Sequence, residues 1–473
     1  MPEGELAIVL HSHMPYVEGF GTWPFGEEWL WEAVASSYLP LLKLFDAHGS
    51  EAIRAQLTLS LTPVLCDQLE APGTLERCQE FLRTIRPESH RLDIEGFRDF
   101  GEATPVTELE ASAAQYAEAA DELERLAACE RGLLAALGSH AIWTSSASHA
   151  ILPLLALQES VDLQMQSGIR AQRQRFGGWD GGFWLPECAH APWLNPLLSE
   201  AGIRLTCVEL TNQLGLGDVS NLKPLQPDDG PALLPIDRQI IDLIWGANGY
   251  PSRPMYRDYH HRTLHDHHAW SNDGSFYDRE RARAQTQQDA KQFIEAAKRR
   301  VADGGLCVCA IDTELLGHWW YEGPWWLEAV LEQSAGSGLT LTSLDESTLE
   351  RHPPRAVDSS QLPAASSWGE AGDLRTWTAP PVADLAWQAR TAELRAFLGR
   401  DGPPSARALR ELLALQSSDW AFLAYRGWAG DYPRQRASGH AAQLVRALEG
   451  ETEETHVRNL APYLGVGEEG SYS

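Results

Sequence analysis

The sequence lacks the features that would place a protein in several specialised classes. It has no CxxC pair among its seven cysteines, no apolar run long enough to span a membrane, no internal repeat and no low-complexity tract. The opening residues, Met1-Pro-Glu-Gly-Glu, carry no basic segment of the kind that begins a secretory signal. We therefore expect a soluble cytoplasmic protein whose thiols are reduced and mostly buried.

Positive charge is scarce as well. Lys and Arg total 38 against 66 Asp and Glu, which gives a formal net charge of −28. A surface of that sign repels phosphate backbones and anionic lipid headgroups, so neither nucleic acid nor a membrane is an expected partner. The sequence does not indicate an oligomeric state.

Tryptophan, in contrast, is abundant. The chain has 473 residues, of which 43% are hydrophobic and 22% charged, as in a globular protein with one large domain and additions, or with two domains. It holds 18 Trp, more than its 12 Tyr or its 12 Phe. A core can be built without so much Trp, so we expect part of it to face a ligand.

Short apolar runs of strand composition alternate with helical patterns through residues 1–350. The runs are Leu6–Leu10, Leu57–Leu61, Ala141–Thr144, Phe183–Leu185, Ile203–Val208, Ile240–Ile244, Leu306–Ile311 and Leu339–Thr342. The helical patterns are Phe25–Ala47, Thr107–Leu137 and Gln285–Arg300. Buried strands that alternate with helices predict an α/β fold with a parallel sheet or barrel.

A second region follows a break in composition. The stretch from His352 to Gly372 is rich in Pro, Ser, Ala and Gly, which is typical of an interdomain connection. Helical patterns at Asp384–Phe397, Ser405–Gln416 and Gly439–Glu449 predict an all-α C-terminal domain over residues 351–450. Residues 451–473 are expected to form a frayed acidic tail.

Polar side chains follow several predicted strands, where the reactive groups of an α/β barrel collect. His11 and His13 leave the first strand two residues apart and so point the same way, and His149 follows the third strand. Glu187 comes directly after the strand that contains Trp184, and Glu209 holds a similar position after the next strand as a second candidate.

The block from Leu306 to Gly323 contains more candidate catalytic and binding residues than any other stretch of this length. Asp312 follows six apolar residues, where a charge is costly unless the strand emerges into a polar cleft. Glu314 shares its face if the strand continues, and His318, Trp319 and Trp320 come next. Indole rings stack on sugar faces while carboxylates bind the rim hydroxyls, so the block predicts a carbohydrate site. The alternative is an aromatic core patch with solvated charges.

Glu187 and Asp312 together supply what a retaining glycosidase needs. One carboxylate attacks the anomeric carbon, and the other protonates the leaving oxygen and later activates the acceptor. This interpretation predicts carboxyl groups about 5 Å apart, and a separation beyond about 9 Å would exclude it.

Three blocks in this order resemble glycoside hydrolase family 57, and within it the 1,4-α-glucan branching enzymes. They are His11-Ser-His-Met-Pro-Tyr, Phe183-Trp-Leu-Pro-Glu-Cys and Ala310-Ile-Asp-Thr-Glu-Leu-Leu-Gly-His-Trp-Trp. Four further stretches agree: Phe25–Val34, Ser60-Leu-Thr-Pro-Val-Leu, Ser366-Ser-Trp-Gly-Glu-Ala-Gly and Gln416-Ser-Ser-Asp-Trp-Ala-Phe. The resemblance spans residues 5 to about 447.

The resemblance implies a (β/α)7 barrel with a helical insertion near 66–138, a helical C-terminal domain, an α-glucan substrate such as glycogen or amylose, and no metal or cofactor. By motif position it makes Glu187 the nucleophile and Asp312 the general acid/base. The residues expected at the substrate are His11, His13, His149, Trp184, His318, Trp319 and Trp320, with Trp29, Trp245, Trp368 and Trp377 as stacking platforms and Asp419 as a glucan contact from the C-terminal domain.

The sequence departs from the family in one region. The branching enzymes of the family carry a longer loop after the nucleophile segment, with a tyrosine that closes over the site. Residues 210–244 here contain no aromatic residue, the block before Trp245 is altered, and a Gly-Tyr-Pro-Gly pattern reads Gly249-Tyr-Pro-Ser252. A missing lid favours hydrolysis over transfer, so a hydrolytic α-amylase is an alternative. A 4-α-glucanotransferase of the same family is a further alternative.

Two more distant alternatives remain from the residues alone. His11, His13, His149 and a carboxylate are suitable zinc ligands, as in a polysaccharide deacetylase or a zinc mannosidase. A non-catalytic glucan-binding protein would also explain the altered loop. The histidine-rich stretch His260–His268 has polar neighbours and is expected to be a surface loop.

Overall fold

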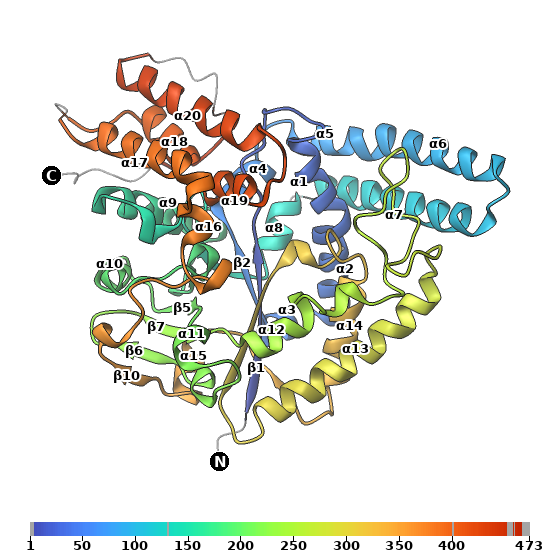
Figure 1. Ribbon diagram of the computed structural model, residues 1–473, viewed down its shortest axis with the longest axis horizontal. Helices are drawn as coiled ribbons and strands as arrows, with labels where there is room; N and C mark the ends of the chain where they lie inside the picture. The colour runs from blue at the N-terminus through green and yellow to red at the C-terminus, as the bar shows by residue number, and fades with distance from the viewer. Residues whose placement is uncertain (1–3, 130–131, 400–401, 452–456, 458, 466–473) are drawn as a thin grey trace.

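The computed structural model describes residues 4–129, 132–399, 402–451, 457 and 459–465. Its centre is a curled sheet of parallel strands (Figure 1). Five of these strands pair in the order β4-β3-β2-β1-β8: β1 (Glu5–Ser12), β2 (Leu57–Leu61), β3 (Ala141–Ser145), β4 (Phe183–Trp184) and β8 (Leu306–Asp312). The short strand β9 (Thr340–Leu341) pairs with the start of β1.

Two further strands close the sheet into a barrel. β5 (Leu205–Val208) lies parallel to β7 (Ala232–Pro235). A parallel bridge between Gly182 and Leu205 joins β5 to the strand before it, and another between Ile236 and Val308 joins the end of β7 to β8. Seven parallel strands therefore form a ring, and every residue of β1 at its centre is buried.

The strand predicted at Ile240–Ile244 is wrong. These residues lie in α12 (Arg238–Trp245), which begins where the Asp237 carboxylate accepts a hydrogen bond of 3.2 Å from the Ile240 N–H. Ile240, Ile241 and Ile244 are buried at helical spacing. The strand that closes the barrel is β7, a few residues earlier, where a short apolar run follows Pro231.

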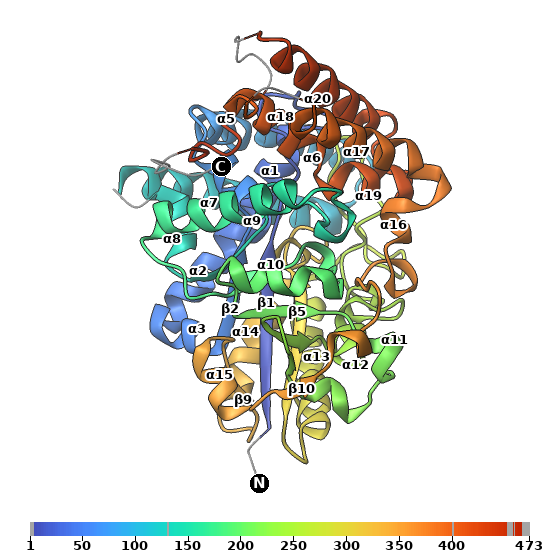
Figure 2. The ribbon, with the colours of Figure 1, turned by 90° about the vertical axis from the view of Figure 1, so that its left-hand side faces the viewer.

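Helices surround the barrel on its outer side (Figures 1 and 2). They are α1 (Glu27–Ala33), α2 (Leu39–His48), α3 (Ser50–Gln56), α4 (Pro63–Leu69), α9 (Gln158–Phe176), α10 (Asn195–Glu200), α11 (Thr211–Leu214), α13 (Arg279–Arg300), α14 (Gly323–Ser334) and α15 (Glu346–Arg351). Among the described residues, no helix is both long and apolar enough to cross a membrane.

A helical insertion follows β2, as the sequence predicts. It contains α5 (Thr74–Glu80), α6 (Arg86–Asp99), α7 (Ala103–Ala128) and α8 (Gly132–Gly138). α6 and α7 form a long hairpin that projects from the barrel (Figure 1). The stretch His260–His268 packs on this hairpin, since His265 Nδ1 lies 2.7 Å from Asp93 Oδ1 and His267 Nε2 lies 3.0 Å from Ser89 Oγ. It is therefore a docked segment rather than a simple surface loop.

The C-terminal helices lie beside the end of the barrel that carries His11 and Asp312 (Figure 1). They are α16 (Arg375–Thr378), α17 (Ala383–Phe397), α18 (Ala406–Leu415), α19 (Ser418–Arg426) and α20 (Tyr432–Leu448). Neither α16 nor α19 was predicted as a helix, and α20 begins seven residues before the predicted start at Gly439. Leu412, Trp420 and Leu444 belong to their shared apolar core.

The predicted connection and tail are more structured than the sequence indicates. Within the stretch from His352 to Gly372, β10 (Arg355–Val357) pairs with β6 (Leu225–Pro227), which in turn pairs with β7. Within the predicted acidic tail, Leu460 is buried and the Ala461 N–H donates to Asp67 Oδ2 at 2.8 Å. Residues 452–456, 458 and 466–473 lie outside the described residues.

Candidate active site

Three predicted histidines meet at the carboxyl end of the barrel strands. The Nε2 atoms of His11 and His149 lie 3.1 Å apart. The ring of His13 stacks on that of His149 with centroids 3.9 Å apart, and Trp184 stacks on His11 at 4.4 Å. Burial, and then the charge of His13, lower the pKa of both His11 and His149. This lowering favours the neutral form of both rings, whose nitrogens are paired with Ser60, with Ser418 and with each other.

His13 differs from this pair because the C-terminal region supplies a partner that favours its protonated form. Its Nε2 lies 2.9 Å from Asp419 Oδ1 at the start of α19. Burial works to lower the pKa of His13, but the Asp419 carboxylate, with smaller effects from Glu314 and Glu187, raises the pKa overall. Ser417 donates to Asp419 Oδ2 at 2.5 Å, and Ser418 Oγ lies 2.8 Å from His149 Nδ1. Residues from the two ends of the chain thus build one cluster.

Glu187 stands in a short turn directly after β4. Its backbone is left-handed, with φ of +61°, a conformation that costs a non-glycine residue about 1–2 kcal/mol. Trp368 holds it there, because its backbone N–H donates to the Glu187 carbonyl at 2.9 Å and its indole N–H to Glu187 Oε2 at 2.6 Å. The other carboxylate oxygen lies 3.9 Å from His149 Nδ1. Burial raises the pKa of Glu187 to about 7, against the lowering effect of the Trp368 hydrogen bond.

Glu209 is linked to the Trp368–Glu187 contact by hydrogen bonds through Arg238. It accepts hydrogen bonds of 3.0 and 2.8 Å from Arg238, and Arg238 also donates to the backbone carbonyl of Trp368 at 3.3 Å. Glu209 therefore acts on Glu187 only through Arg238 and Trp368. This placement makes it a positioning residue rather than a second catalytic acid.

Asp312 ends β8 in register with His11. Burial raises its pKa well above the ordinary range, and the carboxylates of Glu314 and Glu187 raise it further. Asp312 is therefore held in its protonated form, which is the form that a general acid needs.

The Glu314 carboxylate is held by hydrogen bonds from neighbouring residues of the barrel. Tyr38 donates to its Oε1 at 2.5 Å and the His13 backbone N–H to the same oxygen at 3.0 Å. Tyr38 was not predicted, since it lies inside the helical pattern Phe25–Ala47 and just beyond the matching stretch Phe25–Val34. Ser418 could have been found, because it sits beside Asp419 in one of the matching stretches.

The tryptophans expected at the substrate divide into rings that are exposed or partly buried and rings that are buried in the core. Trp245 is 54% exposed and stacks with Trp319, centroids 6.1 Å apart, and His318 lies beside Trp319. Trp29 is partly buried and meets Phe25 and Tyr432 edge-on.

Trp184, Trp320 and Trp377 differ from the expectation. Trp184 is 0% exposed between His11 and Trp368. Trp320 and Trp377 are each only 2% exposed: Trp320 packs among Tyr250, Tyr256 and Trp326, and Trp377 is buried with Ile151 and Ala189. An indole covered in this way offers no face to a sugar, so the core alternative holds for Trp320. Sequence position alone cannot distinguish these rings from Trp319.

The cluster also contains donors of the type that bind zinc. Ligand atoms of His13, His149 and Asp419 all lie within 4.8 Å of one another. A metal ligand must be a neutral imidazole, whereas Asp419 favours the protonated form of His13. The geometry therefore allows a metal, and the charge state of His13 opposes one.

Comparison with known proteins gives matches over nearly the whole chain. Residues 7–363 match the model for glycosyl hydrolase family 57, and residues 404–461 match that for the C-terminal region of 1,4-alpha-glucan branching enzymes. A relative from Mycobacterium tuberculosis, described as a probable 1,4-alpha-glucan branching enzyme, is 30% identical over 93% of this chain and 90% of its own length.

Two solved structures are similar in fold and sequence. A branching enzyme from Pyrococcus horikoshii has a TM-score of 0.84 at 30% identity, covering 97% of this chain and 94% of that one. A branching enzyme from Thermococcus kodakaraensis, solved with glucose, has a TM-score of 0.82 at 26% identity, covering 98% and 92%. The (β/α)7 barrel and helical C-terminal region are thus confirmed.

Proposed function

The chain belongs to glycosyl hydrolase family 57, and we propose on this basis that it is a 1,4-α-glucan branching enzyme that works by a retaining mechanism. The observation that carries the proposal is the position of the C-terminal region. The part of the chain that resembles branching enzymes brings Ser418 and Asp419 against the histidines of the barrel. The substrate is a neutral α-glucan such as amylose or glycogen.

In the first step, Asp312 protonates the oxygen of an α-1,4 link while a carboxylate oxygen of Glu187 attacks the anomeric carbon. The bond to the leaving oxygen breaks, and the cleaved chain is held as a glycosyl ester on Glu187. Mutual repulsion of the two buried carboxyl groups supports this division of roles, because it favours one ionised and one protonated group. The mechanism requires the two groups to lie about 5 Å apart.

In the second step, the Asp312 carboxylate takes the proton of a 6-hydroxyl group on an acceptor chain, and that oxygen displaces Glu187 from the anomeric carbon. The product is an α-1,6 branch, and both catalytic groups return to their starting protonation states. His11, His13 and His149 lie beside this position, and a sugar hydroxyl would exchange with one of the hydrogen bonds that their ring nitrogens now make to protein groups.

Hydrolysis is the alternative outcome of the second step. The region after β5 consists of α11, η6 (Val219–Leu222), β6, β7 and α12, and contains no aromatic residue before Trp245. Water competes with the acceptor wherever a site is open. This observation favours α-amylase activity as the second candidate.

Incubation with amylose distinguishes these activities. A branching enzyme creates α-1,6 links, which isoamylase then releases as a new distribution of short chains. Reducing ends that rise during the incubation without new isoamylase-sensitive links would reject branching and support hydrolysis. Redistributed chain lengths, with no rise in reducing ends and no new isoamylase-sensitive links, would indicate a 4-α-glucanotransferase.

A further inference from the structure

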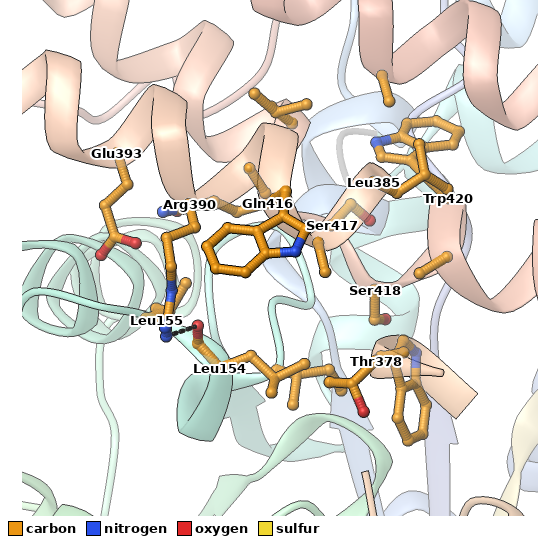
Figure 3. A pocket seen from close by; sticks show the side chains of 18 of the residues that line it. Leu154, Leu155, Thr378, Leu385, Arg390, Glu393, Gln416, Ser417, Ser418 and Trp420 are labelled. Carbon is orange, nitrogen blue, oxygen red and sulfur yellow. Dashed lines mark hydrogen bonds between the residues drawn. The ribbon is translucent and has the colours of Figure 1, made fainter. Parts of the chain in front are cut away.

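A cavity of about 270 Å³ lies between the C-terminal helices and the segment that follows His149 (Figure 3). It occupies about nine times the volume of one water molecule in the liquid, enough for a single hexose ring. Its apolar walls come from three parts of the chain: Ile151, Leu154 and Leu155; Leu385, Ala386 and Ala389 on α17; and Leu415, Trp420 and Ala421.

Trp387 on α17 also lines this cavity and is 68% exposed. Several other tryptophans of this chain are exposed, among them Trp23 and Trp428, but Trp387 combines its exposure with a place in the cavity wall. The flat face of a tryptophan suits the C–H face of a sugar ring. Trp387 therefore offers the stacking surface that Trp320 and Trp377 do not.

The polar groups of the cavity match a neutral ligand. Trp377 lines it, is almost fully buried, and its indole Nε1 has no hydrogen-bond partner among the described residues. Arg390 donates to the Leu154 carbonyl at 3.1 Å (Figure 3), and the Glu393 carboxylate accepts from the backbone N–H groups of Ala156 and Leu157. Arg390 and Glu393 thus already have hydrogen-bond partners. The buried indole N–H of Trp377 is a donor left unpaired in the described part of the chain, which a small shift of the wall would bring to a hydroxyl oxygen.

The cavity and the active site share a wall. Ser418 lines the cavity and is the hydrogen-bond partner of His149 Nδ1, and Ser417 beside it donates to Asp419. Ser418 would therefore lie between a ligand in the cavity and the histidine cluster of the active site.

We propose that this cavity is a second α-glucan site, which holds one glucosyl unit of a chain other than the one being cleaved, stacked on Trp387. The inference rests on the proposed function, because branching needs a donor and an acceptor chain on the same enzyme. A second contact raises the effective concentration of a polymeric substrate at the active site. Short substrates that cannot reach both sites gain nothing from it.

The test compares Trp387→Ala with Trp428→Ala. Trp428 is 55% exposed at the end of α19 and does not line the cavity, so it is a matched control. Both changes are made in a Glu187→Gln background, and binding of β-cyclodextrin, a cyclic α-1,4-glucan, is measured by calorimetry. We expect Trp387→Ala to weaken binding roughly three- to tenfold, the range of a lost aromatic contact, and Trp428→Ala to change it by less than about twofold.

A second variant tests the cavity itself. Ala389→Trp fills it from α17 and should give the same loss of binding while the unfolding temperature confirms a folded protein. In the otherwise active enzyme, Trp387→Ala should raise the KM for amylose by a similar factor. Equal binding in Trp387→Ala, Ala389→Trp and Trp428→Ala would overturn the second site.

The two proposals fail separately. If the unmodified enzyme does not change amylose at all, the proposed function is wrong. If it acts on amylose but neither cavity variant weakens glucan binding, the proposed function stands and only the second site is rejected.

Discussion

The indole N–H of Trp368 donates a hydrogen bond of 2.6 Å to the carboxylate of Glu187. The same tryptophan fixes the Glu187 backbone, so one residue holds the carboxylate in position and lowers its pKa against the larger raising effect of burial. Trp368 was expected to stack on a sugar. The structure gives it a contact with the proposed nucleophile instead.

Replacing Trp368 with Phe should shift the pH dependence of catalysis. The hydrogen bond stabilises the ionised carboxylate, so its loss raises the pKa of Glu187 above its present value of about 7. A nucleophile must be ionised, and therefore the acidic limb of kcat/KM moves to higher pH. Trp245→Phe, which changes an exposed ring, is the control. A lower rate at every pH with an unmoved limb would contradict this role.

Glu187→Gln should abolish turnover and leave glucan binding largely intact. The amide keeps the size of the side chain but cannot form the glycosyl ester, so kcat should fall by roughly 10³-fold or more. Glu209→Gln is the matched control, because Glu209 acts only through Arg238 and Trp368. We expect a much smaller loss there. Comparable losses in the two variants would remove the distinction between nucleophile and positioning residue.

Asp419→Asn should deprotonate His13 near neutral pH. The Asp419 carboxylate is the main group that raises the pKa of this imidazole. Without it, burial dominates and the pKa of His13 falls below its ordinary value. Nuclear magnetic resonance of histidine-labelled protein would follow the titration of His13 directly. If its pKa stays raised in the variant, Glu314 and Glu187 rather than Asp419 set its charge.

Gly369→Ala should destabilise the protein and displace Trp368. A Cβ at this position would lie 2.8 Å from Cζ3 of the buried Trp377 ring, closer than carbon atoms approach. Overpacking of this kind costs about 1–3 kcal/mol of unfolding free energy. Gly178→Ala, where a Cβ meets nothing within 4 Å, is the control. Equal melting temperatures for the two variants would show that the Trp377 ring yields without cost.

The strand-end residues could be predicted because their signal is local. A polar residue after an apolar run stands out in a single stretch of sequence, which is how His11, Glu187 and Asp312 were found. The same local reading failed at Ile240–Ile244, where the apolar spacing fits a buried strand and a helix equally well. The Asp237 side chain caps the first turn and thereby favours the helix.

Contacts between distant residues could not be predicted in this way. Tyr38 meets Glu314 across 276 positions, and Ser418 meets His149 across 269. No pattern in either stretch points to the other. Burial of individual rings was equally hidden, because Trp319 and Trp320 are neighbours in sequence and only the fold puts one of them inside.

The hydrogen bond between His13 and Asp419 joins residues 406 positions apart. During synthesis, His13 leaves the ribosome long before Asp419 has been added, so the barrel strands emerge while their histidine cluster still lacks its carboxylate and its serine. A nascent chain that stops before α19 carries Glu187 and Asp312 but not the groups that set the charge of His13. We therefore expect the chain to become active only after the last helices have docked. Prematurely terminated chains should show no activity rather than partial activity.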